Sequence, residues 1–311
     1  MNLIEIQGLE KHFGDIRAVD GIEMTVRKGE ILGLLGPNGA GKSTTISMIA
    51  TLLEPTAGNI DFQGQSILQA PKAIQSVLGF VPQEIALYPT LTGKENLQFW
   101  GRVYGLRGSA LRERIKAIAG VIGLDERLKD RVETYSGGMK RRLNIGVALL
   151  HEPEFIIMDE PTVGIDPQSR SFILNTVRKL RDQGSTILYT THYMEEVEAL
   201  CDRIYIMDHG KMIAEGTKED LTALIDADEV IRLTVEELTP RLIESLEALS
   251  FVESVVAEKN TIHVTVKENG SHYQALMEAV LGSGAVLQGM DIQKPDLETV
   301  FLHLTGRGLR D

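Results

Sequence analysis

A glycine-rich segment between a predicted strand and a predicted helix constrains this chain more than any other feature of its sequence. The segment runs G-P-N-G-A-G-K-S-T from Gly36 to Thr44, after the apolar run Ile31–Leu35 and before a helical pattern that starts at Thr45. Glycines at such a turn permit tight bends and close approach of a ligand, so backbone N–H groups and the positive helix end can point at an anion. The pattern therefore predicts a phosphate-binding loop rather than an ordinary glycine-rich turn.

The polar residues that end this loop suit a nucleotide with Mg²⁺. Lys42 can reach the terminal phosphates, Ser43 would ligate Mg²⁺, and Thr44 would bond a neighbouring phosphate. The residues expected to contact the nucleotide phosphates are Gly36, Pro37, Asn38, Gly39, Ala40, Gly41, Lys42, Ser43 and Thr44.

Composition excludes several classes of protein. A chain of 311 residues with 43% apolar and 24% charged residues has room for one large or two moderate globular domains. No stretch approaches the ~18 apolar residues that cross a bilayer, and the first residues carry acid where a secretory signal needs base, so we expect a cytosolic chain. The single cysteine, Cys201, excludes an intrachain disulfide and a cysteine-based metal site. A net charge of −12 disfavours nucleic acid as a partner.

The strand and helix patterns predict an α/β fold, a P-loop NTPase core with a helical insertion. Strands are predicted at 3–6, 22–26, 58–62, 77–81 and 186–191, with a helix at 45–53 and a hairpin at 203–214. The continuous apolar run Phe155-Ile156-Ile157-Met158 is typical of a buried parallel strand. We assign residues 1–224 to this domain, with a helical subdomain at about 84–150.

Two further residues are candidates for the nucleotide site, although neither belongs to a specific local sequence pattern. Phe13 falls in a predicted loop, where an aromatic ring can stack on a nucleotide base, although a loop phenylalanine more often serves packing. Gln83 follows the strand at 77–81, and a polar side chain at a strand end can hold Mg²⁺ and an attacking water.

A second predicted anion site follows the helical insertion. Ser136, Gly137 and Gly138 precede a helix whose apolar face includes Leu143 and Val147, so small residues again stand at a helix N-terminus. Alone, this pattern would indicate only a serine N-cap with flexible glycines. One chain has no obvious need for two such sites on one phosphate chain.

Acidic residues and a histidine follow the buried strands. Asp159 and Glu160 end the run at 155–158, where Asp159 would hold the Mg²⁺ shell and Glu160 would orient or deprotonate water. Asp166 lies in the turn that follows. His192 ends the strand at 186–191, from which its imidazole could contact a terminal phosphate.

The chain ends in a predicted small α+β domain at 230–306, after an acidic linker at 226–229. Strands at 231–235, 252–256, 261–266 and 286–292, with helices at 240–249, 271–281 and 296–304, follow the order of a split βαβ arrangement. No catalytic constellation occurs there. A dimer-stabilising or spacer role fits this domain better than regulation or small-ligand sensing.

Taken together, residues 2–220 resemble the nucleotide-binding subunit of an ATP-binding cassette (ABC) transporter. Gly36 to Thr44 is similar to the family's Walker A motif, Asp159-Glu160 to the end of Walker B, and Ser136-Gly137-Gly138 to the family signature. Phe13 matches the adenine-stacking aromatic, Gln83 the Q-loop, Asp166 the D-loop and His192 the switch histidine. The signature distinguishes this family from other P-loop NTPases, which lack the second anion site.

The resemblance implies ATP as the ligand, Mg²⁺ as its metal, and a head-to-tail dimer in which each phosphate loop faces the partner's signature. Catalysis would then fall to Glu160, His192 and Gln83, and the metal to Ser43, Gln83 and Asp159. Separate membrane subunits would dock near Leu87, Tyr88, Leu91 and Trp100, with the chain peripheral on the cytoplasmic face of the membrane.

Details of the sequence point to one group within the family. The variant Y-S-G-G-M-K-R-R-L, the single cassette and the ending P-D-L-E-T-V-F-L-H-L-T-G are similar to bacterial daunorubicin-resistance-type exporter ATPases, whose membrane subunits are separate ABC-2 polypeptides. Met139 stands where many members have glutamine, which puts a ribose contact there in doubt.

Two alternatives agree less well with the sequence. A soluble ABC ATPase acting on ribosomes or DNA usually has two cassettes or a long coiled-coil insertion, and basic surfaces, whereas this chain has one cassette and is acidic. A P-loop kinase or GTPase would leave the S-G-G-M segment and His192 unexplained.

Overall fold

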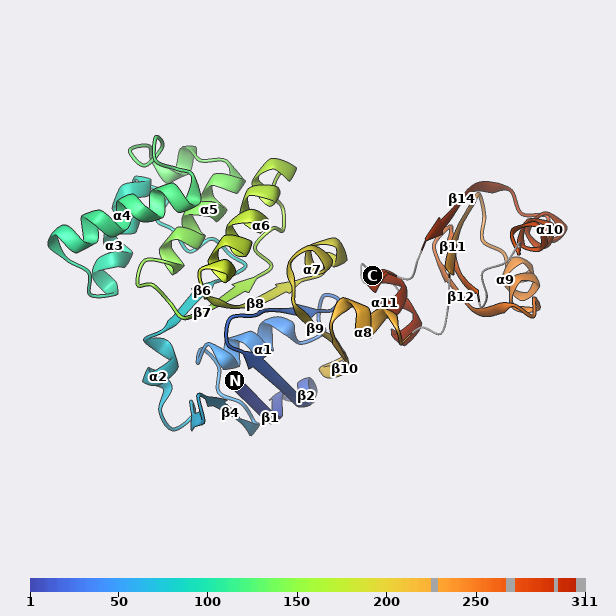
Figure 1. Ribbon diagram of the computed structural model, residues 1–311, viewed down its shortest axis with the longest axis horizontal. Helices are drawn as coiled ribbons and strands as arrows, with labels where there is room; N and C mark the ends of the chain where they lie inside the picture. Colours follow the sequence, from blue (N-terminus) through green and yellow to red (C-terminus); the bar gives the residue numbers. More distant parts are fainter. Residues whose placement is uncertain (225–228, 267–271, 294–295, 306–311) are drawn as a thin grey trace. The chain divides into compact units, whose positions relative to one another are not determined.

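The computed structural model describes residues 1–224, 229–266, 272–293 and 296–305 (Figure 1). The chain divides into two compact units, Met1–Met212 and Ile213–Asp311. The short helix α8 (Lys218–Thr222) packs against α11 (Leu297–Thr305) within the second unit. The domain division after residue 224 stays a prediction, and the predicted linker at 226–229 falls outside the described residues except for Glu229, which begins a strand.

A largely parallel sheet forms the centre of the first unit, and it positions the candidate site. Its strand order is β10-β9-β3-β8-β7-β6. The bounds are β3 Ile31–Leu35, β6 Leu78–Val81, β7 Phe155–Asp159, β8 Thr186–Thr191, β9 Arg203–Asp208 and β10 Lys211–Gly216. Every residue of β3, β7 and β8 is buried, which explains the continuous apolar runs in β3 and β7. Since neighbouring strands from β6 to β9 run parallel, their carboxyl ends meet at one edge.

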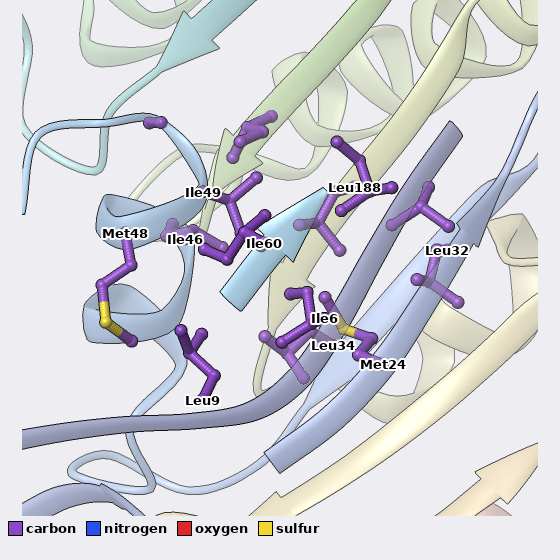
Figure 2. Close-up of a cluster of buried hydrophobic side chains, with 14 of the residues drawn as sticks. Ile6, Leu9, Met24, Leu32, Leu34, Ile46, Met48, Ile49, Ile60 and Leu188 are labelled. Carbon is purple, nitrogen blue, oxygen red and sulfur yellow. The ribbon is translucent and has the colours of Figure 1, made fainter. Parts of the chain in front are cut away.

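An antiparallel sheet packs near the parallel one, with α1 (Lys42–Ile49) contributing to the core between them. This sheet has the order β2-β1-β4-β5, with bounds β1 Asn2–Phe13, β2 Ile16–Arg27, β4 Ala57–Phe62 and β5 Gln65–Ser66. Figure 2 shows Ile46 and Ile49 of α1 among Ile6 and Met24 of the antiparallel sheet and Leu34 of the parallel sheet. Helix α1, which follows the phosphate loop, is thus packed against residues of both sheets.

Helices cover the other side of the parallel sheet. Their bounds are α3 Gly93–Val103, α4 Gly108–Ile122, α5 Gly137–Ala148, α6 Pro167–Asp182 and α7 Met194–Leu200. The short helix α2 (Pro71–Gln75) lies instead on the α1 side, where its Ile74 belongs to the same core as Ile46. Helix α5 packs against α3, α4, α6 and β6, and Figure 1 shows α3 to α6 grouped together. The predicted helical insertion is confirmed.

The second unit contains a four-stranded antiparallel sheet of order β12-β13-β11-β14. Its elements are β11 Glu229–Val235, α9 Pro240–Glu247, β12 Val252–Glu258, β13 Thr261–Val266, α10 Tyr273–Ser283 and β14 Leu287–Gln293. Strand β13 lies between β11 and β12, which confirms the split βαβ arrangement. Leu233, Leu242 and Leu276 belong to its buried core.

Two sequence predictions for the first unit were wrong in detail. Phe13 ends a long strand rather than sitting in a loop, because β1 and β2 form one hairpin in which Phe13 pairs with Ile16. The register shifts between Ile6 and Leu9 and between Leu9 and Lys11 break the alternation that identifies a strand. Helix α1 begins at Lys42 rather than Thr45, so the loop lysine lies on its first turn.

Candidate nucleotide site

The phosphate loop leads into the uncapped N-terminus of α1. Gly41 is the N-cap residue, with a left-handed backbone (φ 107°), and no side chain accepts from the first N–H groups of the helix. A Cβ atom at Gly41 would lie 2.4 Å from the carbonyl oxygen of Ala18. Only glycine fits this position, and the helix end retains N–H donors for an anion.

Lys42 is buried under the loop, with only 4% of its surface exposed. Its Nζ donates to the carbonyl oxygens of Gly36 (2.8 Å) and Pro37 (3.1 Å) and lies 3.3 Å from Oε1 of Glu160. Burial lowers the pKa of Lys42, and the charge of Glu160 opposes that effect. The ammonium group is therefore held against both the loop and the acidic residues.

The two acidic residues after β7 share one hydroxyl partner. Thr190 Oγ1 donates to Asp159 Oδ1 (2.7 Å) and accepts from the backbone N–H of Glu160 (3.0 Å). Glu160 has a left-handed backbone (φ 44°), which is unusual for a residue other than glycine. Because of this backbone turn at Glu160, the carboxylates of Asp159 and Glu160 point in different directions. Burial raises the pKa of Asp159, and Ser43 Oγ lies 3.5 Å from Asp159 Oδ1.

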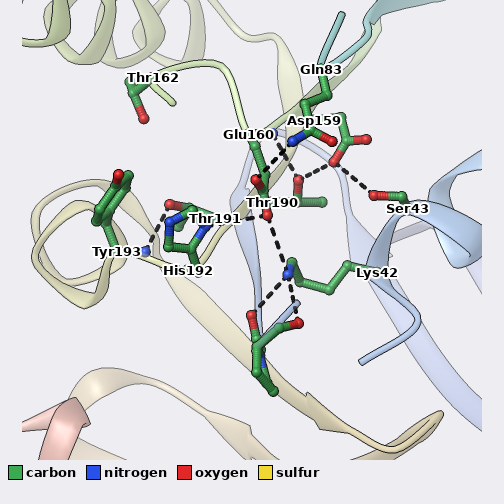
Figure 3. Close-up of polar contacts among 12 residues, drawn as sticks. Lys42, Ser43, Gln83, Asp159, Glu160, Thr162, Thr190, Thr191, His192 and Tyr193 are labelled. Atoms are coloured by element: carbon green, nitrogen blue, oxygen red, sulfur yellow. Dashed lines mark hydrogen bonds and ion pairs between the residues drawn. The ribbon is translucent and has the colours of Figure 1, made fainter. Parts of the chain in front are cut away.

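The carboxylate of Glu160 is surrounded by side-chain nitrogen atoms from three separate segments (Figure 3). Besides Lys42, Gln83 Nε2 donates to Glu160 Oε2 (3.3 Å), and His192 Nδ1 lies 3.4 Å from Glu160 Oε1. Glu160 itself is only 4% exposed. Residues 42, 83, 160 and 192, predicted separately from the sequence, thus meet at the carboxyl edge of the parallel sheet.

The residues at this edge fit Mg²⁺ and a triphosphate. The hydroxyl of Ser43, the carboxylate of Asp159 and the amide of Gln83 are oxygen donors of the kind that Mg²⁺ prefers, in a site where phosphates would supply further ligands. Lys42 and the free N–H groups of α1 offer positive charge to the phosphates.

Phe13 lies outside the group of residues around Glu160. It is 50% exposed at the end of β1, and Lys11 Nζ lies 5.3 Å from its ring centroid. The paired strand β2 reaches the loop at Ala18, the neighbour of Gly41. An exposed ring on this hairpin is available for base stacking.

The signature residues lie on different elements from the phosphate loop. Ser136 is the N-cap of α5, and its Oγ accepts from the backbone N–H of Met139 (3.2 Å). In Figure 1, α5 lies among α3, α4 and α6, apart from α1. Asp166 caps α6 by accepting from the backbone N–H of Ser169 (2.8 Å), and Met139 packs against the buried core of the helices. Within one chain the two helix N-termini are not brought together.

Sequence reasoning missed a buried carboxylate that links two of the predicted motifs. Glu196 on α7 is fully buried, and its Oε2 accepts from Thr162, Tyr189 and Thr191 at 2.8 to 3.1 Å. Its Oε1 accepts from Arg170 Nε (2.6 Å). It thereby joins the turn before Asp166 to the end of β8 beside His192. The only signal in the sequence is a pair of acids in the first turn of α7, which ordinarily indicates a solvated helix start.

The predicted docking residues lie near a partly apolar surface of α3. Tyr88 is 43% exposed and packs edge-on against Phe99, while Leu87 and Trp100 are partly buried. A groove of about 570 Å³ is lined by Leu91, Glu95, Gln98, Phe99, Arg102 and Val103. Across the described residues, no helix has the length and apolarity needed to cross a bilayer.

Comparison with known proteins gives consistent matches. The profile of the ABC transporter family matches residues 19–163. The chain is 47% identical to the linearmycin resistance ATP-binding protein LnrL of Bacillus subtilis (strain 168), over 99% of this chain and 100% of that protein. It is 35% identical to the daunorubicin resistance ATP-binding protein DrrA3 of Streptomyces coeruleorubidus, over 97% and 96%. Among solved structures, it is similar to a dimeric ATP-binding cassette in a post-hydrolysis state with ADP and Pi (25% identity, TM-score 0.63, 69% of this chain and 98% of that chain).

Proposed function

The chain belongs to the ATP-binding proteins of ABC transporters, in the daunorubicin-resistance-type group, and from that premise we propose that it drives export through separate membrane subunits. It is an ATPase with the P-loop NTPase fold of that family. The names of its relatives, which refer to resistance to linearmycin and daunorubicin, support export as the direction of transport.

One observation carries the proposal: the carboxylate of Glu160 stands among Lys42, Gln83 and His192, next to the start of α1. A nucleotide whose triphosphate is bound at the start of α1 would have its terminal phosphate near this carboxylate. Glu160 would then orient or deprotonate the attacking water, while Lys42 stabilises charge on the phosphate oxygens. His192 would contact the terminal phosphate.

Magnesium fits the proposal through the chain's own oxygen donors. Ser43, Asp159 and Gln83 would hold the ion, which neutralises charge on the phosphates when bound. The hydroxyl of Thr190 keeps Asp159 oriented toward Ser43. The predicted division of labour between a metal-binding Asp159 and a water-activating Glu160 agrees with their different surroundings.

A head-to-tail dimer would complete each site. The start of α5 at Ser136 lies apart from α1 in this chain, so a second copy would supply its signature to the phosphates bound at the first. Phe13 would stack on the adenine, and Asp166 would lie near the dimer partner. A homologous cassette has been solved as a dimer with ADP and Pi, which supports this arrangement.

The membrane partner would dock on the surface near Tyr88 and Trp100. The exposed rings of Tyr88 and Phe99 and the adjacent groove offer apolar contact area for an element of a permease. The chain would then act from the cytoplasmic face of the membrane as a peripheral subunit.

Glu160→Gln is the experiment that tests this function. Loss of a general base costs about 10²- to 10⁴-fold in rate, so the variant should bind ATP normally and hydrolyse it at most at about 1% of the parent rate. ATP binding is measured by fluorescence titration, and turnover by phosphate release. Hydrolysis at the parent rate would remove Glu160 from the mechanism.

The same variant can trap the transporter complex. In detergent with Mg-ATP, Glu160→Gln should co-purify with a multi-span membrane protein, and Lys42→Ala, which should bind ATP poorly, is the matched control. Recovery of ribosomal material or DNA instead, with no membrane protein, would contradict the export proposal.

A further inference from the structure

Arg141 fastens the signature helix to the backbone of the Q-loop. Its guanidinium donates from Nη1 to the carbonyl oxygen of Pro82 (2.7 Å) and from Nη2 to that of Gln83 (2.5 Å). Arg141 is buried, with only 4% of its surface exposed. A rigid planar fork on two successive carbonyl groups fixes both the position and the direction of the segment it holds.

A second side chain on the same face of α5 holds the next part of that segment. Asn144, which is 3% exposed, accepts from the backbone N–H of Ala86 through its Oδ1 (3.2 Å). Residues 141 and 144 are three apart, so they share one face of the helix. Three hydrogen bonds therefore join α5 to residues 82–86, although β6 and α5 are far apart in the sequence.

The segment held in this way carries the amide that touches Glu160. Gln83 Nε2 lies 3.3 Å from Glu160 Oε2, so a displacement of the backbone at Pro82 and Gln83 moves that amide relative to the carboxylate. The start of the same α5 helix carries Ser136, Gly137 and Gly138. Helix α5 thus connects the signature at its N-terminus with the Q-loop along its side.

We propose that Arg141 and Asn144 are positioning residues that make the signature helix and the Q-loop move as one body. A dimer partner's phosphates that engage the start of α5 would thereby set the distance between Gln83 and Glu160. The inference rests on the proposed ATP hydrolysis and adds to it a physical link between signature engagement and the water-activating carboxylate.

Arg141→Lys is the variant that tests this link. Lysine keeps the positive charge but has a single ammonium group in place of the two-pronged fork. A misplacement of about 1 Å far from the chemistry can cost about 100-fold in rate, so we expect kcat to fall about 10- to 100-fold while the KM for ATP changes less than threefold. The KM stays nearly constant because the phosphate loop is untouched.

Arg114→Lys is the matched control. Arg114 also donates to two successive carbonyl oxygens, those of Leu149 (2.6 Å) and Leu150 (3.0 Å), but it holds the C-terminal end of the same helix α5. This variant should lose thermal stability comparable to that lost by Arg141→Lys and keep the parent kcat. Equal losses of kcat in the two variants would assign the effect to general loosening of α5 and would overturn the proposal.

Hydrogen exchange provides a readout that does not depend on turnover. In the full-length protein, Arg141→Lys and Asn144→Ala should each raise amide exchange in the segment 82–88 about tenfold, and Arg114→Lys should leave it at the parent rate. If amide exchange in the segment 82–88 stayed at the parent rate in both Arg141→Lys and Asn144→Ala, the proposed link between α5 and the Q-loop would be refuted. If the parent protein hydrolysed no ATP, the proposed function would fail, whereas the exchange result would still decide whether α5 holds the Q-loop.

Discussion

At the scale of single residues, the buried carboxylate of Asp159 opposes folding at neutral pH. Burial raises its pKa, so the folded chain binds a proton there more tightly than the unfolded chain does. Its favourable contribution to stability is therefore present below the unfolded pKa of about 3.9 and is lost as the pH rises through the raised folded value. We expect Asp159→Asn to increase the free energy of unfolding by about 1 kcal/mol at pH 7, with a smaller gain below pH 4. Urea unfolding at both pH values measures this difference.

Asp166 is a control residue, because its carboxylate is expected to contribute to stability with the opposite pH dependence. Hydrogen bonds from Ser169 lower its pKa, so its contribution is present at neutral pH and is lost as the pH falls through the folded value. Asp166→Asn should lower stability at pH 7. An Asp159→Asn protein no more stable than the parent at pH 7 would contradict the conclusion that the buried carboxylate of Asp159 opposes folding at neutral pH.

The sequence could identify Lys42, Asp159 and Glu160 because each stands in a short pattern next to a buried strand or a helix start. It could not identify Thr190, Arg141 or Glu196. Their roles depend on contacts across the fold, such as the hydroxyl of Thr190 between two acids or the fork of Arg141 on the carbonyl of Gln83. No local period encodes such contacts, and a buried arginine resembles a surface one in sequence.

At the scale of elements, the two signature glycines differ in how closely other residues pack against them. A Cβ atom on Gly138 would lie 2.4 Å from Ser169 Cβ at the start of α6, whereas one on Gly137 would meet nothing closer than the Gly164 carbonyl oxygen at 4.0 Å. Gly138→Ala should therefore force α5 and α6 apart and lower the free energy of unfolding by about 1 to 3 kcal/mol. Gly137→Ala should leave stability unchanged or raise it by up to ~1 kcal/mol through helix propensity. Thermal unfolding of the two variants compares them, and equal melting temperatures would show that α5 and α6 are not closely packed at Gly138.

The predicted helices and strands agree with the structure where the sequence has a regular local pattern. The bounds of β8 and β13 agree with the structure because each is a short apolar or alternating run between turn residues. The sequence predicts only residues 3–6 of the long β1, because the register shifts of this strand interrupt the alternation and Gly8, with φ 56°, lies within it. The predicted helix start at Thr45 is too late, since the chemistry of Lys42 indicates a loop residue whereas its backbone is helical.

At the scale of the whole molecule, the working unit is expected to be two chains. Lys42→Ala should inactivate a chain through its phosphate loop, and Gly137→Asp through its signature, where an acid suits the helix start but repels phosphate. Half of the dimers in an equal mixture carry one variant of each kind, and each of these has one intact site. We therefore expect the mixture to recover about a quarter of the parent ATPase rate, although each variant alone is inactive. No recovery on mixing folded variants would contradict sites shared between chains.

The position of β3 in the parallel sheet also has a consequence for how the protein is made. Strand β3, which leads into the phosphate loop, has β8 and β9 as its sheet neighbours, and both are encoded far downstream. Since translation adds about 5 to 20 residues per second, the ribosome needs on the order of ten seconds to make the roughly 150 residues between β3 and β8. During that interval the nascent apolar run Ile31–Leu35 has no partner strand, so it is a natural binding site for a chaperone on the growing chain.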